Sequence, residues 1–145
     1  MNAQELLDEA GQLLTTVVPG TRGRWPRACA TLIRLALEKS LDDYWSVRLP
    51  DATKCSMRAQ LLLLPRYAGA EVAGDARDAW FGLARATHHH AYELAPTAAE
   101  LRTWHELVSK ITVAIRPGNT RLYWQHEDRD LLARRHLRES YKAGS

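Results

Sequence analysis

Three adjacent histidines, His88, His89 and His90, are the residues of this sequence whose type most directly suggests chemistry. Imidazole titrates near neutral pH and is the commonest protein ligand for zinc. Successive residues of a helix point about 100° apart, so three neighbours cannot converge on one ion unless the helix unwinds. Because there is also no His-Glu-x-x-His pair, no Cys-x-x-Cys pair and no glycine-rich phosphate loop, we expect neither a metal nor a cofactor.

A second interpretation joins the last histidine of the run to an arginine. Arg85 precedes His90 by five positions, at the predicted junction between two helices. An imidazole can transfer protons near neutral pH, and a guanidinium beside it can stabilise the charge of a pentacoordinate phosphorus. Such a pair suits cleavage of RNA without a metal. Arg85 and His90 are therefore the candidate catalytic residues, and His88 and His89 are either supporting polar groups or exposed residues of a helix end.

The spacing of this pair is weak evidence by itself, because a chain with 16 arginines and 6 histidines contains such spacings by chance. The position of the pair in the chain distinguishes it from the other matches. Arg121 with His126, and Arg129 with His136, have comparable spacings but lie in or before the polar C-terminal end. The first pair lies between two strongly indicated helices. His90 could instead have a structural role as a cap of the fourth helix, since a basic residue near the C-terminal end of a helix interacts favourably with the helix dipole.

Other polar residues also have structural explanations. Glu38 and Asp42 lie four positions apart on a predicted helix and could act as paired carboxylates, but Arg34 offers Glu38 an ordinary surface ion pair. His105 lies beside an apolar stripe, where a partly buried and hydrogen-bonded histidine is expected. An aromatic and basic patch could stack on bases or anchor the end of the chain, and it comprises Arg121, Tyr123, Trp124 and His126.

Five helices must position these residues. Leucine and alanine are abundant whereas isoleucine and valine are few, which favours helix over strand. Asp75 is the expected N-cap of the fourth helix, Pro65 is expected to end or kink the third, and Thr97 with Glu100 predicts a capping box at the fifth. Apolar residues at helical spacing predict helices over Asn2–Val17, Pro26–Trp45, Lys54–Leu64, Asp75–His88 and Thr97–Ile115.

The fold class that follows is all-α, an antiparallel bundle of about five helices over residues 1–118. Residues 119–145 are polar and charged, with too few apolar residues for a core of their own. We expect this tail to pack on the bundle or on a partner, with one short helix around Asp130–Ser140.

The composition agrees with one globular domain. The chain has 145 residues, of which 46% are hydrophobic and 26% charged, and no apolar run approaches the roughly 18 residues of a membrane span. The N-terminus lacks the pattern of a signal peptide, so we expect a cytoplasmic protein without a membrane partner. Cys29 and Cys55 are expected to be small core residues. The charge of +3 permits a phosphate-containing partner without demanding one.

The arrangement of these residues resembles a known family. An antiparallel helical bundle with Arg85-x4-His90 near a helix junction is similar to the HEPN domain of prokaryotic defence and toxin systems. The stretch Arg34–Tyr44, RLALEKSLDDY, also resembles the long core helix of that family. The resemblance covers Thr21–Arg116. One position departs from it, because the residue after the family's arginine is commonly asparagine and is Ala86 here.

The resemblance implies a metal-independent endoribonuclease of a toxin or defence system. His90 would transfer the proton while the 2′-hydroxyl attacks the adjacent phosphate, and Arg85 would stabilise the phosphorane, leaving a 2′,3′-cyclic phosphate. The implied partners are RNA, a second copy of the chain in a homodimer, and an antitoxin such as a nucleotidyltransferase. The alternative is a non-catalytic module of the same fold that dimerises or binds RNA or another partner, which Ala86 and the modest net charge favour.

Overall fold

The computed structural model describes residues 1–16, 24–88 and 94–119. Within these ranges it contains five α-helices, one short 3-10 helix and no strand, which confirms the all-α prediction. None of these helices is long and apolar enough to cross a membrane. The short helix expected in the tail lies outside the described residues. In chain order the elements are α1 (Ala3–Thr15), α2 (Trp25–Arg48), η1 (Pro50–Lys54), α3 (Met57–Ala68), α4 (Ala70–Thr87) and α5 (Ala98–Ile115).

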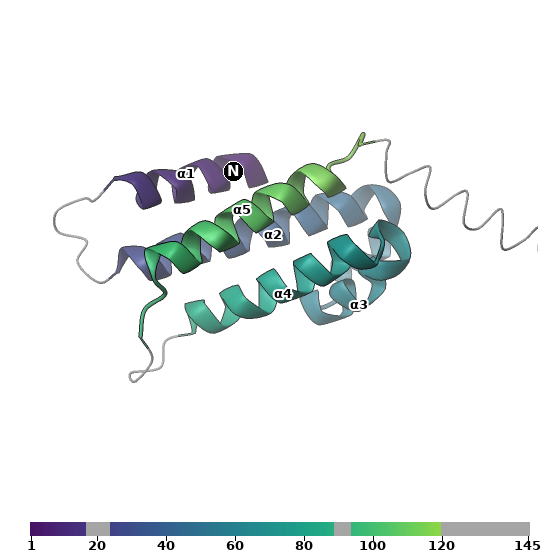
Figure 1. The fold of residues 1–145 in the computed structure, drawn as a ribbon. Coiled ribbons are helices and arrows are strands. Elements are labelled where there is room, and N and C mark those ends of the chain that lie inside the picture. Colours follow the sequence, from purple (N-terminus) through teal and green to yellow (C-terminus); the bar gives the residue numbers. More distant parts are fainter. Residues whose placement is uncertain (17–23, 89–93, 120–145) are drawn as a thin grey trace, which may run out of the picture.

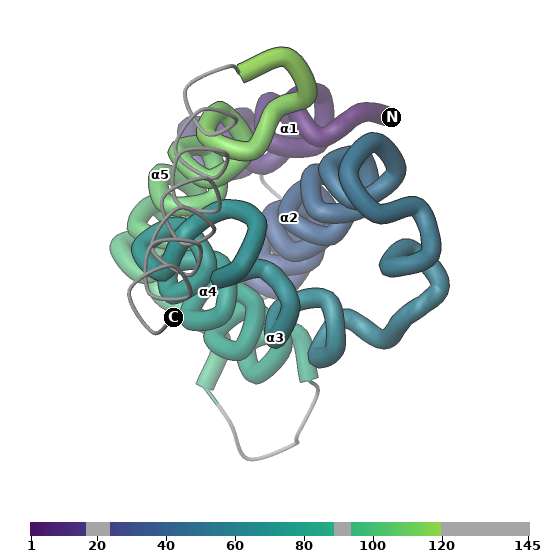
Figure 2. The backbone as a smooth tube through the Cα atoms, turned by 90° about the vertical axis from the view of Figure 1, so that its right-hand side faces the viewer, coloured from purple at the N-terminus to yellow at the C-terminus, as the bar shows by residue number. Residues whose placement is uncertain are grey.

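Four helices form an antiparallel bundle, in which α1 and α4 run in one direction and α2 and α5 in the other (Figure 1). The end of α1, the start of α2, the end of α4 and the start of α5 therefore lie at one end of the bundle. α2 contacts α1, α4 and α5, whereas the short α3 packs against α4 (Figure 2). Residues from four helix ends are thereby gathered at one end of the molecule, although they lie far apart in the sequence.

The core is built around α2, which buries side chains toward three neighbouring helices. Trp45 and Ile33 of α2 have no accessible surface, and burying a side chain of this size stabilises the fold by about 1.5–3 kcal/mol. The side of α4 that enters the core carries small residues, which permit close helix packing. The buried residues of α4 are Ala73, Ala76, Ala79 and Leu83, and those of α2 include Cys29, Ala30, Ala36, Leu37 and Leu41.

α1 is joined to α5 by a polar contact within the apolar packing. The Nε2 atom of His105 lies 2.8 Å from the carbonyl oxygen of Leu7, and the imidazole is partly buried. The ring lies beside Gly11, where an added Cβ would be at an ordinary van der Waals distance of 3.5 Å from the same nitrogen. The prediction that His105 is a hydrogen-bonded, partly buried histidine is confirmed.

Capping boxes begin both the first and the last of these helices. The side chain of Asn2 accepts a hydrogen bond from the Glu5 amide, and the Glu5 carboxylate accepts one from the Asn2 amide. Thr97 and Glu100 make the same reciprocal pair at the start of α5. The cap predicted for α5 is therefore confirmed, and it fixes where the chain enters the helix.

The predicted boundaries of the third helix are wrong at both ends. Lys54 belongs to η1, and α3 begins after Ser56, whose hydroxyl accepts a hydrogen bond from an amide of the first turn. Pro65 lies inside α3, which continues to Ala68. A proline removes one backbone hydrogen bond, but the helix continues past it and buries Ala68, and this burial offsets part of the loss.

The predicted N-cap of the fourth helix is also wrong. α4 begins at Ala70, and Gly69 before it has a φ of 88°, a conformation that turns the chain between α3 and α4 and favours glycine. Ala73 already faces the core. Asp75 lies within α4 on its surface, with its Oδ2 atom 3.6 Å from Nζ of Lys110 on α5. An early start of α4 is favoured because its alanine-rich first turns combine high helix propensity with a buried face.

The two cysteines differ in their surroundings. Cys29 is buried on α2 next to α1, with its Sγ atom 3.6 Å from the carbonyl oxygen of Ala10. Burial raises the pKa of this thiol from 9.0 to about 11, because the thiolate loses its hydration. Cys55 is exposed after η1. The prediction of a core cysteine is therefore correct for Cys29 and wrong for Cys55, whose position in a helix connection removes it from the core.

These environments predict different thiol reactivities. At pH 8 we expect an aromatic disulfide reagent to modify only Cys55 in the folded protein and both cysteines after denaturation. The free energy of unfolding should fall as the pH rises from 9 toward 11, because the thiol of Cys29 ionises first in the unfolded chain. Cys29→Ala should reduce this alkaline loss. Rapid modification of both thiols in the folded protein would contradict the burial of Cys29.

A glycine permits close contact between α4 and α5. A Cβ placed on Gly82 would overlap the six-membered ring of Trp104, whereas one placed on Gly74 of the same helix meets nothing within 4 Å. We expect Gly82→Ala to destabilise the protein by about 1–3 kcal/mol through this overlap. The matched variant Gly74→Ala should stabilise it by up to about 1 kcal/mol through helix propensity. Urea unfolding of both variants measures the difference, and equal effects would show that Trp104 moves away freely.

Candidate functional site

A groove of about 490 Å³ lies between the C-terminal half of α4 and the start of α5. We call it the α4–α5 groove. α4 contributes Asp78, Phe81 and Arg85, which recur every three or four residues and therefore share one face of the helix. α5 contributes Glu100 and Trp104 from its first two turns. Most of its lining residues come from α4, the start of α5 and the start of α2. The end of α4 and the starts of α5 and α2 lie at the same end of the bundle (Figure 1).

Arg85 is the predicted catalytic residue whose position the structure describes. Its side chain is exposed in the last turn of α4 and lines the groove. No hydrogen bond or ion pair joins its guanidinium to any other described residue. All the donors of this group are consequently available to an anion entering the groove.

The predicted histidines fall at the edge of the described structure. His88 is exposed, follows the last residue of α4 and lines the groove. His89 and His90 lie outside the described residues, and the chain is described again from Leu94, which also lines the groove. The described residues on either side of the segment that contains His90, namely His88 and Leu94, therefore both line the groove.

A second arginine of the groove was not identified from the sequence. Arg27, in the first turns of α2, lines the groove and donates a hydrogen bond from Nη1 to the carbonyl oxygen of His88 at 3.1 Å. The last carbonyl groups of a helix have no partner within it and carry the negative end of its dipole, so a guanidinium is favourable there. Arg27 thus binds the end of α4 and contributes positive charge to the groove.

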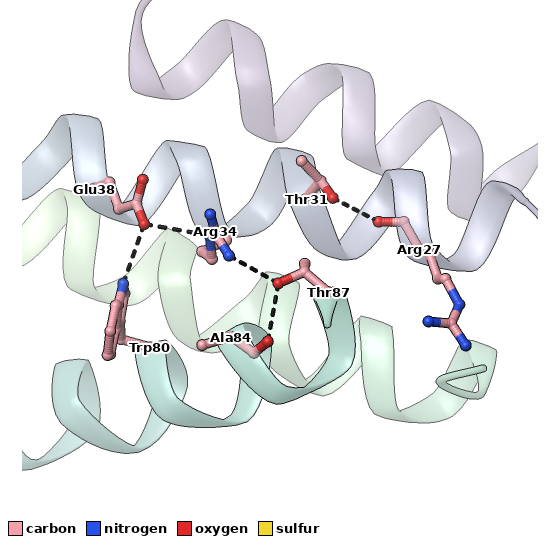
Figure 3. Close-up of polar contacts among 7 residues, drawn as sticks. All are labelled: Arg27, Thr31, Arg34, Glu38, Trp80, Ala84 and Thr87. Carbon is pink, nitrogen blue, oxygen red and sulfur yellow. Dashed lines mark hydrogen bonds and ion pairs between the residues drawn. The ribbon is translucent and has the colours of Figure 1, made fainter. Parts of the chain in front are cut away.

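A chain of polar contacts joins α2 to α4 (Figure 3). Arg34 of α2 donates from Nη1 to the hydroxyl of Thr87 at 2.8 Å, and its Nε atom lies 3.2 Å from Oε1 of Glu38. The same Glu38 oxygen accepts a hydrogen bond from Nε1 of Trp80 at 3.1 Å. The hydroxyl of Thr87 in turn donates to the carbonyl oxygen of Ala84 at 3.0 Å. Two side chains of α4, Trp80 and Thr87, are thereby connected to two side chains of α2, Glu38 and Arg34.

This network revises the predictions for Arg34, Glu38 and Asp42. The ion pair between Arg34 and Glu38 is confirmed, but it lies between two helices with side chains only 30% and 28% exposed, rather than on an open surface. Asp42 is exposed and joins no described contact of Glu38, so the two carboxylates are not paired. A sequence signal for this network is helical spacing on α2. Intervals of seven and four residues place Arg27, Arg34 and Glu38 on one face of the helix.

The electrostatics of the groove are mixed. Arg27 and Arg85 line it together with Asp78 and Glu100, so the formal charges of these four side chains cancel. One carboxylate oxygen of Glu100 already accepts a hydrogen bond from the Thr97 amide. A phosphate is therefore favoured at the arginine end of the groove, near the end of α4, rather than along its whole length.

The aromatic side chains of the groove are partly accessible. Phe81 is 40% exposed and packs edge-on against Trp80 with ring centroids 5.1 Å apart. The guanidinium carbon of Arg58, from α3, lies 5.9 Å from the centre of the Phe81 ring. Leu94 is 96% exposed at the rim. An apolar ring or a flat base could contact this surface.

The remaining sequence candidates do not join the groove in the described structure. The tail pairs and the aromatic patch lie outside the described residues; these are Arg121, Tyr123, Trp124, His126, Arg129 and His136. Within residues 1–16, 24–88 and 94–119, no three histidine, cysteine or carboxylate side chains are grouped as metal ligands.

The different contacts of two arginines predict different effects on stability. Arg85→Ala should change the free energy of unfolding by less than about 0.5 kcal/mol, because its side chain is exposed and makes no described polar contact. Arg34→Met should lower it by about 1–2 kcal/mol, because the partly buried Glu38 carboxylate and Thr87 hydroxyl lose their partner. Chemical denaturation measures both values. A large loss in Arg85→Ala would mean that this arginine is structural.

Comparison of the chain with models of known protein families, with curated proteins and with solved structures gives no match. The resemblance to the HEPN family stays a prediction that rests on Arg34–Tyr44 and on the spacing of Arg85 and His90. What the groove can do must therefore follow from its own residues and their geometry.

Proposed function

We propose that this chain is a HEPN-like endoribonuclease that cleaves RNA without a metal ion at the α4–α5 groove. Arg85 and His90 are the catalytic residues in this proposal, and His88 and His89 support them. The main observation that supports this proposal is that residues before and after the histidine segment line the groove. Arg85 lines the groove, and so do His88 and Leu94, the described residues on either side of the segment that contains His90.

The residue types in this arrangement are suited to transesterification. The imidazole of His90 accepts the proton of the ribose 2′-hydroxyl as the 2′-oxygen attacks phosphorus. The bond from phosphorus to the 5′-oxygen breaks, and this oxygen receives a proton from an imidazolium, for which His88 and His89 are the adjacent sources. The guanidinium of Arg85 donates hydrogen bonds to the phosphorane oxygens. The products are a 2′,3′-cyclic phosphate and a 5′-hydroxyl.

The composition of the groove supports a single-stranded substrate rather than a duplex. Among the described residues that line the groove, the two arginines, Arg27 and Arg85, both lie near the end of α4. Phe81 and Trp104 offer partly accessible aromatic rings, on which an unpaired base can stack. A duplex would need a longer basic surface to follow its phosphates.

A second function is favoured by a different set of features. Ala86, which also lines the groove, supplies no polar group beside Arg85. The four charged side chains of the groove cancel, and Leu94 and Phe81 expose apolar surface at its rim. These features suit a non-catalytic module that binds a protein partner or RNA. The two functions differ in whether RNA is cleaved.

Cleavage of a labelled, unstructured RNA of mixed sequence in the presence of EDTA tests the first function. We expect the native protein to produce fragments that end in a 2′,3′-cyclic phosphate. Arg85→Ala and His90→Ala should each reduce the rate by roughly 100-fold or more, as removal of a general acid–base or charge-stabilising group does.

Arg66→Ala is the matched control, because Arg66 is an exposed arginine at the end of α3 and does not line the groove. Its cleavage rate should equal that of the native protein. Absence of cleavage by the native protein, or equal cleavage by the His90→Ala variant, would overturn the nuclease proposal. RNA binding without cleavage would support the binding module instead.

A further inference from the structure

We propose that Arg34 is a positioning residue, which holds the last turn of α4 so that Arg85 is presented to the groove. The inference rests on the proposed ribonuclease function. Arg34 does not line the groove and makes no contact there, so its effect is transmitted through Thr87 and the backbone of α4.

The need for such a residue follows from the position of Arg85. Its long side chain is exposed and is held by no described polar contact, so its backbone alone determines where the guanidinium can reach. Arg85 is the third-last residue of α4, and the last turn of a helix frays readily because its carbonyl groups lack partners within the helix. A misplacement of about 1 Å can reduce a catalysed rate by as much as about 100-fold.

Arg34 meets this need at the correct turn. Its hydrogen bond reaches Thr87, two residues after Arg85, and the Thr87 hydroxyl passes a second hydrogen bond to the carbonyl oxygen of Ala84, one residue before Arg85 (Figure 3). The residues that precede and follow Arg85 in this turn, Ala84 and Thr87, are thus joined to each other, and Thr87 is joined to α2 through Arg34. The amide of His88 also donates to the carbonyl oxygen of Ala84 at 3.1 Å, which closes the same turn.

Arg34 is itself fixed by its neighbours. Glu38 accepts from Trp80 through the same oxygen that faces the Arg34 guanidinium, so the carboxylate cannot rotate away without losing a contact to α4. The guanidinium is planar, and it forms an ion pair with Glu38 at one edge while it donates a hydrogen bond to Thr87 from Nη1. Lysine has a single ammonium group on a flexible chain and would not reproduce this geometry.

Arg27 supplies a second anchor that the Arg34 contacts do not include. It binds the carbonyl oxygen of His88, the residue from which the chain continues toward His90. Both arginines come from the same face of α2, and both bind the end of α4. Loss of Arg34 should therefore loosen the last turn without releasing α4 from the bundle.

The test uses three variants and one matched control in the full-length chain. Arg34→Met removes the donor, Thr87→Val removes the hydroxyl at constant size, and Thr87→Ser restores a hydroxyl. Lys39→Met is the control, because Lys39 and Asp43 form an ion pair of the same i, i+4 type on α2, 2.9 Å long, without reaching α4.

Amide hydrogen exchange measures the hold on the helix end without reference to RNA. Arg34→Met and Thr87→Val should accelerate exchange at the amides of residues 85–88 by at least about tenfold relative to those of residues 76–80, and Lys39→Met should not. Cleavage kinetics then measure the consequence. The first two variants should lower kcat by at least about tenfold with KM nearly unchanged, and Thr87→Ser should keep more than about half of the native kcat.

The outcomes separate this inference from the proposed function. If the native protein cleaves no RNA, the ribonuclease proposal is overturned whatever the exchange rates are. If the native protein cleaves RNA but Arg34→Met and Thr87→Val keep its kcat, Arg34 is not a positioning residue. Unchanged exchange at residues 85–88 in both variants would also overturn it, as would a rise in KM alone, which indicates a lost RNA contact instead.

Discussion

The burial of α2 among α1, α4 and α5 is the constraint on which the rest of the structure depends. A polar group in the contacts of a helix enclosed on three sides destabilises the fold unless it is paired, because an unpaired buried polar group costs about 1–3 kcal/mol. Along most of its length α2 meets its neighbours with apolar residues, such as Ile33 and Leu37. Toward the end of α4 the contact becomes polar, and there Glu38 accepts a hydrogen bond from Trp80 and forms an ion pair with Arg34.

This pairing divides the arginines near the groove into two kinds. Arg34 and Arg27 bind groups of the protein itself, namely the hydroxyl of Thr87 and the carbonyl oxygen of His88. Arg85 binds no other described residue and faces the groove. Their chemical type is the same, but the two bound arginines order the helix end from which the third extends. A free guanidinium on an ordered backbone is the arrangement that recognition of an external anion requires.

The groove depends equally on the contact of α4 with α5. Gly82 lets the ring of Trp104 lie directly against α4, and the capping box at Thr97 fixes where α5 begins. These two local features bring an aromatic ring and a carboxylate of α5 opposite Arg85. The mixed charge and the partly exposed rings of the groove follow from this packing. In the proposed function they suit one nucleotide with its phosphate better than a long charged surface.

Local signals predict much of this fold because they act over a few residues. The apolar periodicity of α2 and the capping box of α5 each depend on neighbours within a turn, and both are correct. Predictions failed where distant burial decided the outcome. Pro65 does not end α3, because Leu64 and Ala68 are covered by other elements. Asp75 does not cap α4, because the turn before it already contributes Ala73 to the core.

The sequence by itself determined the all-α class, the capping box of α5 and the choice of Arg85 as a candidate residue, since these follow from residue type and short spacing. Only the tertiary structure decided that Arg27, 61 residues before His88, binds the end of α4, and that Arg34 and Glu38 are part of a junction between helices. It also decided that Arg85 shares a groove with α5. Hydrogen bonds and grooves between helices depend on how the helices pack, and no spacing within one helix encodes that distance.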